Sequence, residues 1–367
     1  MRLVATNSVV PGMKLARPIY NDKGQTLLCS GVELSRPILQ RLDRMGIRTI
    51  YVQDELTADI KYEERIPREL KTKAIQSIES TFKKIQEDST IPNSLVMEKS
   101  SKDLMDVIRS IQEELERSND LMSIISDVFA YDDYIFTHSF NVTVYTLALG
   151  KQLGLSKKDL EVLGLGALLH DIGKMNVPKK ILLKPGKLTN QEFEYIKKHP
   201  VDGFNILRNV YTMNLLVAHC AYQHHERLNG SGYPRGIRGD EIHLFGKIIA
   251  VADVFDAVTS DRVYRDAKLP SEALEILFAG AGTLYDPNAI HAFRKSVAMY
   301  PVGITVQLSD GRKGVVSRQN PGVSDRPVVR VFEDNGRPVA PYEVDLMKKL
   351  SVVITNCEME YKKSPYK

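Results

Sequence analysis

The sequence predicts a mainly α protein, with a small α/β module at its N-terminus and a small β module at its C-terminus. Residues 119–300 are dominated by apolar residues at helical spacing. After Pro301 the pattern changes to short β-type runs separated by turn signals such as Asp310-Gly311. We therefore expect four segments: a small N-terminal module at 1–55, a helical linker or hairpin at 56–118, the main helical domain at 119–300, and a β-rich module at 301–367.

The N-terminal segment carries short β-type runs near Ser8–Val9 and at Ile19–Tyr20. A helix is expected to begin near Ser35 and to end at Gly46, because glycine commonly follows the last residue of a helix. Ile50–Val52 then closes the module as a strand. The segment shows no catalytic pattern.

Two stretches of helical periodicity in 56–118 are separated by Pro92-Asn93, which predicts a helical hairpin. Their apolar positions are Ile75, Ile78, Phe82 and Ile85, followed by Leu104, Val107, Ile108, Ile111 and Leu115. One interpretation is a linker packed on the main domain, and the other is a coil that dimerises or transmits a signal. The repeat is too short to specify a coiled coil, so we favour the packed linker and keep a homodimer as the alternative.

The C-terminal segment predicts a small β module. Its expected strands are Thr305–Leu308, Val315–Val316, Val328–Phe332 and Val352–Ile354.

The composition is that of an ordinary globular protein, with 43% hydrophobic and 26% charged residues among 367. The formal net charge of +4 is modest, so we expect no polymeric nucleic acid as partner. The three cysteines lie far apart without a CxxC spacing, which favours free thiols in a reducing compartment. Without an apolar run of membrane-spanning length or a leader-type start, the sequence predicts a cytoplasmic protein outside the membrane.

Metal-binding residue types recur through the helical domain. They are His138, His170, Asp171, His199, His224, His225 and Asp253. Imidazole nitrogens combined with a few carboxylates suit first-row transition metals, whereas calcium and magnesium prefer oxygen ligands. Two such metals would form a clamp for the hydrolysis of a phosphoester.

The sequence delivers His170 and Asp171 at the end of the apolar run Leu160–Leu169. An ionisable pair at the end of a buried helix is costly without partners, and a metal removes that cost. Adjacent helical positions diverge by ~100°, so the two residues can face two neighbouring metals with Asp171 between them. The alternative is a pair that makes hydrogen bonds only.

A capping box at Thr189–Glu192 begins the helix that precedes His199. Pro200 follows His199 and predicts a corner in the chain. His138 lies on one helical stripe with other apolar residues, and Asp253 interrupts the apolar run Ile248–Phe255. Taken alone, His138 would more often be a structural histidine of the core, and the alternative for His199 is a histidine at a helix C-terminus that interacts with the helix dipole.

A glycine-rich loop, 228–236, follows His224-His225 directly. Glycines let the backbone approach a ligand closely, and Tyr233 could stack on a flat base. Arg262 and Arg265 are three residues apart, as a phosphate clamp requires, although a solvated basic surface is the alternative for this pair.

Two strings together resemble the HD-GYP family of cyclic di-GMP phosphodiesterases, a branch of the HD superfamily of metal-dependent phosphohydrolases. They are His170-Asp171-Ile172-Gly173-Lys174 and His224-His225-Glu226-Arg227, the latter followed by Gly230-Ser231-Gly232-Tyr233-Pro234. The resemblance covers roughly 120–300. Further matches in the same order are Lys184-Pro185-Gly186, His199-Pro200, Asp253 and Arg262-Val263-Tyr264-Arg265.

The resemblance implies an all-helical HD-type domain that hydrolyses cyclic di-GMP with two divalent metal ions, iron or manganese, and a metal-bridged hydroxide. One metal would be held by His138, His170, Asp171 and Asp253, and the other by Asp171, His199, His224 and His225. Asp171 and Lys174 would be the catalytic residues, and Lys174, Lys184, Tyr233, Arg262 and Arg265 would bind substrate. Glu226 is expected to orient a histidine.

Some members of that family carry a glutamate one turn before the first histidine, which supports a third metal. This chain has Tyr134 there, so we expect two metals. The product could be linear pGpG or GMP. Alternatives are hydrolysis of another cyclic dinucleotide or nucleotide, and a non-catalytic sensor of the dinucleotide. The remaining histidines, His219, His243 and His291, are expected to be structural or exposed.

Overall fold

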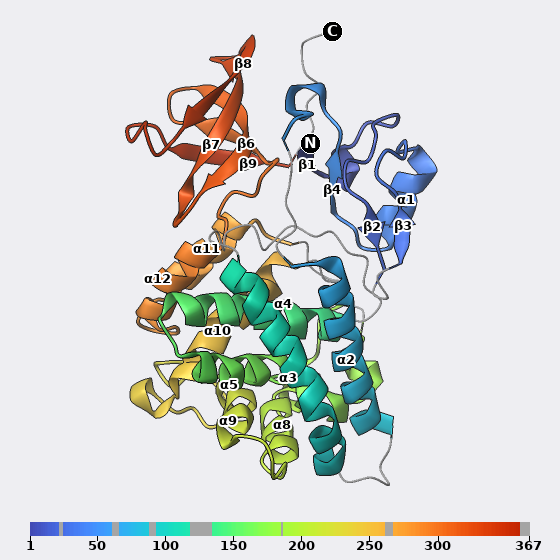
Figure 1. The fold of residues 1–367 in the computed structure, drawn as a ribbon, viewed down its shortest axis with the longest axis vertical. Helices are drawn as coiled ribbons and strands as arrows, with labels where there is room; N and C mark the ends of the chain where they lie inside the picture. The colour runs from blue at the N-terminus through green and yellow to red at the C-terminus, as the bar shows by residue number, and fades with distance from the viewer. Residues whose placement is uncertain are drawn as a thin grey trace. The chain divides into compact units, whose positions relative to one another are not determined.

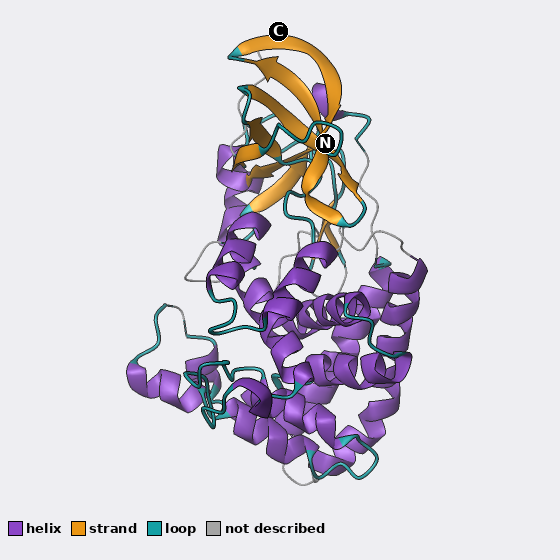
Figure 2. Ribbon diagram, turned by 90° about the vertical axis from the view of Figure 1, so that its left-hand side faces the viewer, coloured by secondary structure: helices purple, strands orange, loops and turns teal. Residues whose placement is uncertain are grey.

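The computed structural model describes residues 1–21, 25–60, 66–87, 93–117, 134–184, 186–260 and 267–359. The chain divides into two compact units. The terminal unit contains both ends of the chain, Met1–Arg65 and Val297–Lys367, and the helical unit contains Ile66–Ser118 and Asp133–Ser296. Figure 2 shows that helices make up the helical unit, whereas the strands gather in the terminal unit.

The helical unit is built from helices (Figure 1). Its elements are α2 (Arg68–Glu87), α3 (Asn93–Arg117), α4 (Tyr134–Gln152), α5 (Lys157–Leu168), the 3₁₀ helix η4 (Ile172–Asn176), α6 (Lys179–Leu182), α7 (Asn190–Ile196), α8 (His199–Leu207), α9 (Leu215–Gln223), the 3₁₀ helix η5 (Gly239–Glu241), α10 (Leu244–Thr259), α11 (Pro270–Ala279) and α12 (Pro287–Ser296).

The helices α2 and α3 belong to this unit and are not a free coil. The apolar stripe of α2, including Ile78 and Phe82, is buried, as is the stripe of α3 around Leu104 and Ile108. The two helices pack on each other, α2 also packs on α4, and α3 packs on α5. Both helices thus pack on the main helical domain.

The centre of the helical unit is formed by α4, α5 and α10, which pack against one another. Most of α4 and α10 and the C-terminal half of α5 are buried, which is typical of helices in the middle of a core. Local signals set several helix starts. Ser156 caps α5 by accepting a hydrogen bond from the Asp159 backbone, and Thr189 and Glu192 form the predicted capping box of α7.

The terminal unit combines two small antiparallel pairs with a five-stranded antiparallel sheet of order β8-β7-β6-β5-β9. Its elements are β1 (Arg2–Ala5), the 3₁₀ helix η1 (Thr6–Ser8), β2 (Ile19–Tyr20), β3 (Thr26–Leu28), α1 (Arg36–Arg44), β4 (Thr49–Val52), the 3₁₀ helix η2 (Glu55–Thr57), β5 (Thr305–Leu308), β6 (Arg312–Asn320), β7 (Val323–Asp334), β8 (Arg337–Asp345) and β9 (Ile354–Glu358). The predicted fold class, mainly α with small α/β and β modules, is confirmed.

Two local predictions in this unit were wrong: Ser8 does not lie in a strand, and the last strand is β9, Ile354–Glu358, instead of Val352–Ile354. The first strand is Arg2–Ala5, paired with β4, and Ser8 lies in a 3₁₀ turn instead of a strand. The sequence also gave no indication of β8. Gly46 has a φ of 74° just after α1, as the predicted glycine at the helix end requires.

The two ends of the chain are hydrogen-bonded to each other. The Leu3 amide donates to the Gly303 carbonyl at 2.9 Å, and the Ala5 amide donates to the Met359 carbonyl at 2.7 Å. The buried Arg2 guanidinium donates to Thr305 Oγ1 at 2.9 Å. In the described part of the chain, no helix has both the length and the apolar character needed to cross a membrane.

Candidate metal centre

The seven residues with metal-binding side chains converge from five places in the helical unit. His138 comes from α4, His170 and Asp171 from the turn after α5, His199 from the first residue of α8, His224 and His225 from the end of α9, and Asp253 from α10. All are buried except His225, which is partly buried. The structure thus brings together residues that are up to 115 positions apart in the chain.

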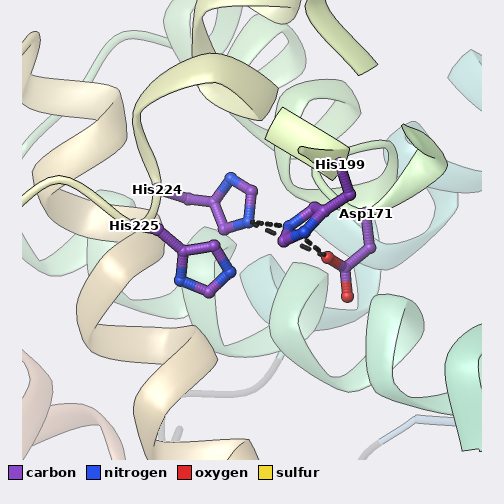
Figure 3. A group of neighbouring side chains, drawn as sticks. All are labelled: Asp171, His199, His224 and His225. Atoms are coloured by element: carbon purple, nitrogen blue, oxygen red, sulfur yellow. Dashed lines mark hydrogen bonds and ion pairs between the residues drawn. The ribbon is translucent and has the colours of Figure 1, made fainter. Parts of the chain in front are cut away.

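Asp171 lies between two sets of nitrogen atoms. Its Oδ2 is 3.3 Å from His170 Nε2 and 3.5 Å from His138 Nε2. Its Oδ1 is 3.3 Å from His199 Nε2 and 3.8 Å from His224 Nε2. In Figure 3 the His199 ring lies between the His224 ring and the Asp171 carboxylate. Each carboxylate oxygen therefore faces a different group of histidines.

These residues form two groups with the spacing of metal ligands, and Asp171 belongs to both. In each group, one ligand atom from every residue lies within 4.8 Å of the others. The first group contains His138, His170 and Asp171, and the second contains Asp171, His199, His224 and His225. Asp253 adjoins the first group, with its Oδ1 3.1 Å from His138 Nε2 and 3.9 Å from His170 Nε2.

The Nδ1 atoms of three histidines are held by backbone carbonyls. His170 Nδ1 lies 2.7 Å from Ala167 O, His199 Nδ1 lies 2.8 Å from Ile196 O, and His224 Nδ1 lies 2.9 Å from Ala221 O. A carbonyl only accepts hydrogen bonds, so each Nδ1 carries the proton and each Nε2 keeps a free lone pair. Every one of these Nε2 atoms faces Asp171.

This arrangement fits a bound cation. His199 Nε2 and His224 Nε2 are 3.2 Å apart, and neither has a proton to donate if both Nδ1 atoms are protonated. His170 Nε2 and Asp171 Oδ1 are buried without a hydrogen-bond partner. Buried lone pairs that face one another are unfavourable unless a positive charge lies among them.

The protonation states agree with this interpretation. Burial lowers the pKa of His199 to about 4. Burial, and then the neighbouring histidines, hold the pKa of His224 well below its ordinary value of 6.5. Burial opposes the ionisation of Asp171, but the nearby His170 and Lys174 outweigh it and keep the pKa of its carboxyl well below 3.8. At neutral pH the second group is therefore made of neutral imidazoles and a carboxylate, which are metal-ligand forms.

Close backbone packing brings α8 to the turn that carries His170 and Asp171. A Cβ on Gly173 would lie only 2.0 Å from the His199 carbonyl oxygen, so no larger residue fits there. The chain turns after α7, as Pro200 predicts, but His199 itself is the first residue of α8. Pro200 is compatible with this because the first turn of a helix does not use the missing N–H.

The chain that follows His225 is hydrogen-bonded to Glu226. Glu226 is buried, and its carboxylate accepts hydrogen bonds from the backbone amides of Arg235, at 2.9 Å, and Ile237, at 3.2 Å. The expectation that Glu226 orients a histidine was wrong, since its contacts hold this loop. Tyr233 stacks on His225 with 4.6 Å between ring centroids, so one face of its ring is already covered.

The expected substrate-binding residues are only partly placed beside the centre. Lys174 Nζ donates to Asp171 Oδ2 at 2.5 Å. Lys184 forms an ion pair with Glu192 at 2.7 Å. Arg262 and Arg265 lie outside the described residues.

Sequence reasoning missed Asp256, which is 1% exposed and lies one helical turn after Asp253 on α10. Its Oδ2 is 2.7 Å from His138 Nδ1. The available signal was a second carboxylate three residues after Asp253 in an apolar helix. Of the other histidines, His243 caps α10 by accepting a hydrogen bond from the Phe245 amide, which is a structural role as expected.

Family models match most of the chain. The model of the HD domain matches residues 104–289, and the model of a KOW domain associated with HD domains matches residues 305–362, the region of the five-stranded sheet.

Curated relatives share the helical unit. The chain is 41% identical over 218 residues to the cyclic di-GMP phosphodiesterase PA4108 of Pseudomonas aeruginosa, covering 59% of this chain and 52% of that protein. It is 38% identical over 195 residues to the cyclic di-GMP phosphodiesterase response regulator RpfG of Xanthomonas campestris, covering 52% and 51%. It is also 41% identical over 174 residues to the 3'3'-cGAMP-specific phosphodiesterase 3 of Vibrio cholerae, covering 47% and 38%. The chain thus spans about half the length, or less, of these relatives.

Among solved structures, Bd1817, a HDG"Y"P protein from Bdellovibrio bacteriovorus, has a similar fold. The TM-score is 0.51 at 18% identity, covering 79% of this chain and 97% of that one. At this identity the likeness describes the fold alone.

Proposed function

The chain belongs to the HD domain family, whose model matches half of it, and we propose that it is a metal-dependent phosphodiesterase that hydrolyses cyclic di-GMP. The named cyclic di-GMP phosphodiesterases among its relatives support its place in the HD-GYP branch. The observation that carries the proposal is the position of Asp171, whose two oxygens face different groups of histidines.

We propose that these two groups hold two divalent ions, iron or manganese. The first ion would be held by His138, His170, Asp171 and Asp253, and the second by Asp171, His199, His224 and His225. When bound, such a pair supplies a water nucleophile at neutral pH and stabilises negative charge on the phosphate. The chemistry of the donors supports transition metals because neutral imidazoles predominate.

Lys174 is proposed to contact the scissile phosphate. Its ammonium now neutralises Asp171 Oδ2, the oxygen that faces the first group. Once a cation occupies that group, the positive charge on Lys174 is repelled and is free to pair with a phosphate oxygen, where it would stabilise the departing group.

We propose that Tyr233 contacts His225 with one face of its ring and the substrate with the other. Its stacking on His225 fixes that ligand, and its remaining surface is available to a guanine base. Lys184, Arg262 and Arg265 remain proposed phosphate contacts, by their resemblance to the family's positions.

A second substrate is supported by a specific observation. Two relatives named 3'3'-cGAMP-specific phosphodiesterases are 41% and 42% identical to this chain, as similar as a cyclic di-GMP phosphodiesterase at 41%. A metal clamp recognises phosphate and not the base, so both dinucleotides fit the same chemistry. The presence of every expected donor argues against a sensor that has lost catalysis.

The test is an anaerobic incubation of the full chain, loaded with Mn²⁺ or Fe²⁺, with cyclic di-GMP and 3'3'-cGAMP in parallel. Products are followed by chromatography. Faster conversion of cyclic di-GMP, to pGpG or onward to GMP, is the expected result. Faster conversion of 3'3'-cGAMP would mean that this dinucleotide, and not cyclic di-GMP, is the preferred substrate. If both dinucleotides stay intact with metal bound, the enzymatic proposal is overturned.

A further inference from the structure

His138 is held differently from His170, His199 and His224. The Nδ1 atoms of His170, His199 and His224 each contact a neutral backbone carbonyl. His138 Nδ1 instead contacts a carboxylate, Asp256 Oδ2, at 2.7 Å. Of the two rings in the first metal group, His138 is therefore backed by a carboxylate and His170 by a neutral carbonyl.

The position of each histidine in its helix explains the difference. Ala167, Ile196 and Ala221 lie in the last turns of α5, α7 and α9, where carbonyls lack partners within the helix. A histidine three residues later can use such a carbonyl. His138 is the fifth residue of α4, where the preceding carbonyls are engaged by the helix itself. Its Nδ1 needs an acceptor from another element, and α10 supplies it.

Asp256 is fixed in place by both of its oxygens. Oδ2 contacts His138, and Oδ1 accepts a hydrogen bond from Asn141 Nδ2 at 3.0 Å. Asn141 lies one turn after His138 on α4, and Asp256 lies one turn after Asp253 on α10. Two layers of contacts thus join these helices: His138 with Asp253 on the metal side, and Asp256 with His138 and Asn141 behind it.

We propose that Asp256, held by Asn141, is the positioning residue of the first metal group and makes this group bind its divalent cation more tightly than the second. A carboxylate behind an imidazole fixes the ring's tautomer and orientation and raises its basicity as a ligand. In the second group, His199 and His224 have only neutral carbonyls behind them. His225 Nδ1 lies 3.8 Å from Asp253 Oδ2, beyond hydrogen-bond distance, so this group lacks a carboxylate hydrogen-bonded behind a ring. The inference rests on the metal centre of the proposed function but not on its substrate.

The test is a calorimetric titration of the metal-stripped full chain with Mn²⁺, in wild type and in two variants. Wild type is expected to bind in two steps. Asp256→Ala should weaken the tighter step by about 10–100-fold and leave the weaker step in place. Asp256→Asn keeps an acceptor oxygen without the charge and should fall between wild type and Asp256→Ala. Asp54→Asn is the matched control, because it removes the charge of another buried carboxylate, in the terminal unit, and should leave both steps unchanged.

Equal Mn²⁺ binding by wild type and Asp256→Ala would overturn the inference, as would equal weakening of both steps. If Asp256→Ala does not fold, Asn141→Ala decides: it should weaken the tighter step by a smaller factor, and unchanged binding would count against the proposal. No substrate is present in the titration. A wild-type protein that binds Mn²⁺ but leaves cyclic dinucleotides intact would therefore overturn the proposed substrate and not this inference.

Discussion

The Nε2 atoms of His199 and His224 face each other at 3.2 Å, and each ring has its Nδ1 atom on a backbone carbonyl. Neutral rings in this state present two lone pairs to one point, and Asp171 Oδ1 lies 3.3 Å from the first of them. Three electron-pair donors at such distances repel one another. We therefore expect the helical unit to be considerably more stable with a divalent cation than without it.

Metal removal should lower the melting temperature of the helical unit. A ligand present at 100 times its Kd stabilises the folded state by about 2.7 kcal/mol, which for a unit of this size corresponds to roughly 5–10 °C. Thermal unfolding of chelator-stripped protein, with and without added Mn²⁺, measures the shift. Mg²⁺ at the same concentration is the control and should have little effect, because it prefers oxygen ligands. Identical melting temperatures in all three conditions would contradict the metal centre.

Gly173→Ala should disrupt the metal centre through the backbone. Its methyl would lie 2.0 Å from His199 O, so α8 must move, at a cost of about 3 kcal/mol. We expect a lower melting temperature together with weaker Mn²⁺ binding. Gly203→Ala in the same contact is the matched control, since its methyl would meet Ala221 Cβ at 3.3 Å and improve helix propensity. Equal stability of the two variants would show that the close approach of Gly173 to His199 O does not exclude a larger residue at this position.

The stability of the metal-free protein should be greatest near pH 6.5. Burial disfavours a charged His138, but the hydrogen bonds that its ring donates to Asp253 and Asp256 outweigh it and raise its pKa to about 9. The folded state therefore binds this proton more tightly, and the stabilisation, complete below pH 6.5, is lost as the pH rises through about 9. Burial lowers the pKa of His199 to about 4, so its protonation destabilises the fold as the pH falls from 6.5 to about 4.

Melting temperatures of chelator-stripped protein between pH 4 and 9.5 test this prediction. His138→Gln should flatten the alkaline side of the profile and leave the acid side. An alkaline side that is unchanged in this variant would mean that another group titrates there.

Glu226→Ala should release the loop that carries Tyr233. Two loop amides lose their acceptor, which costs about 1–3 kcal/mol, and Tyr233 loses its fixed position over His225. We expect kcat/KM to fall by about 10–100-fold, with metal content retained. Glu241→Ala is the control, because its exposed carboxylate also accepts a backbone amide, from Arg238, but it lies in η5, outside the loop 228–236 that carries Tyr233. Equal losses in both variants would indicate a general loop effect.

The members of the metal centre could be predicted from the sequence because their signals are local. Most lie at a helix end or in a turn, whereas His138 and Asp253 are polar residues within apolar helices, and such patterns are readable within ten residues. Which histidines face each oxygen of Asp171 depends on how α8 packs on η4 and how α9 packs on α5. Asp256 was missed for the same reason, since only the packing of α10 on α4 brings it to His138 Nδ1.

The terminal unit was less predictable because its pairings are long-range. Leu3 pairs with Tyr51 and with Gly303, so no local pattern distinguishes Arg2–Ala5 from the neighbouring residues. Strand β8 contains Pro338 and Pro341, and prolines in a sequence argue against a strand. The strand is possible because it lies at the edge of the sheet, where an unpaired side tolerates proline.

The most direct test of the shared carboxylate is a parallel measurement of metal content and turnover in Asp171→Ala. Because Asp171 belongs to both donor groups, its loss should remove both metal ions and reduce hydrolysis of cyclic di-GMP to the background rate. Asp240→Ala, which alters an exposed carboxylate, should keep wild-type values. Wild-type metal content and turnover in Asp171→Ala would contradict the proposed centre.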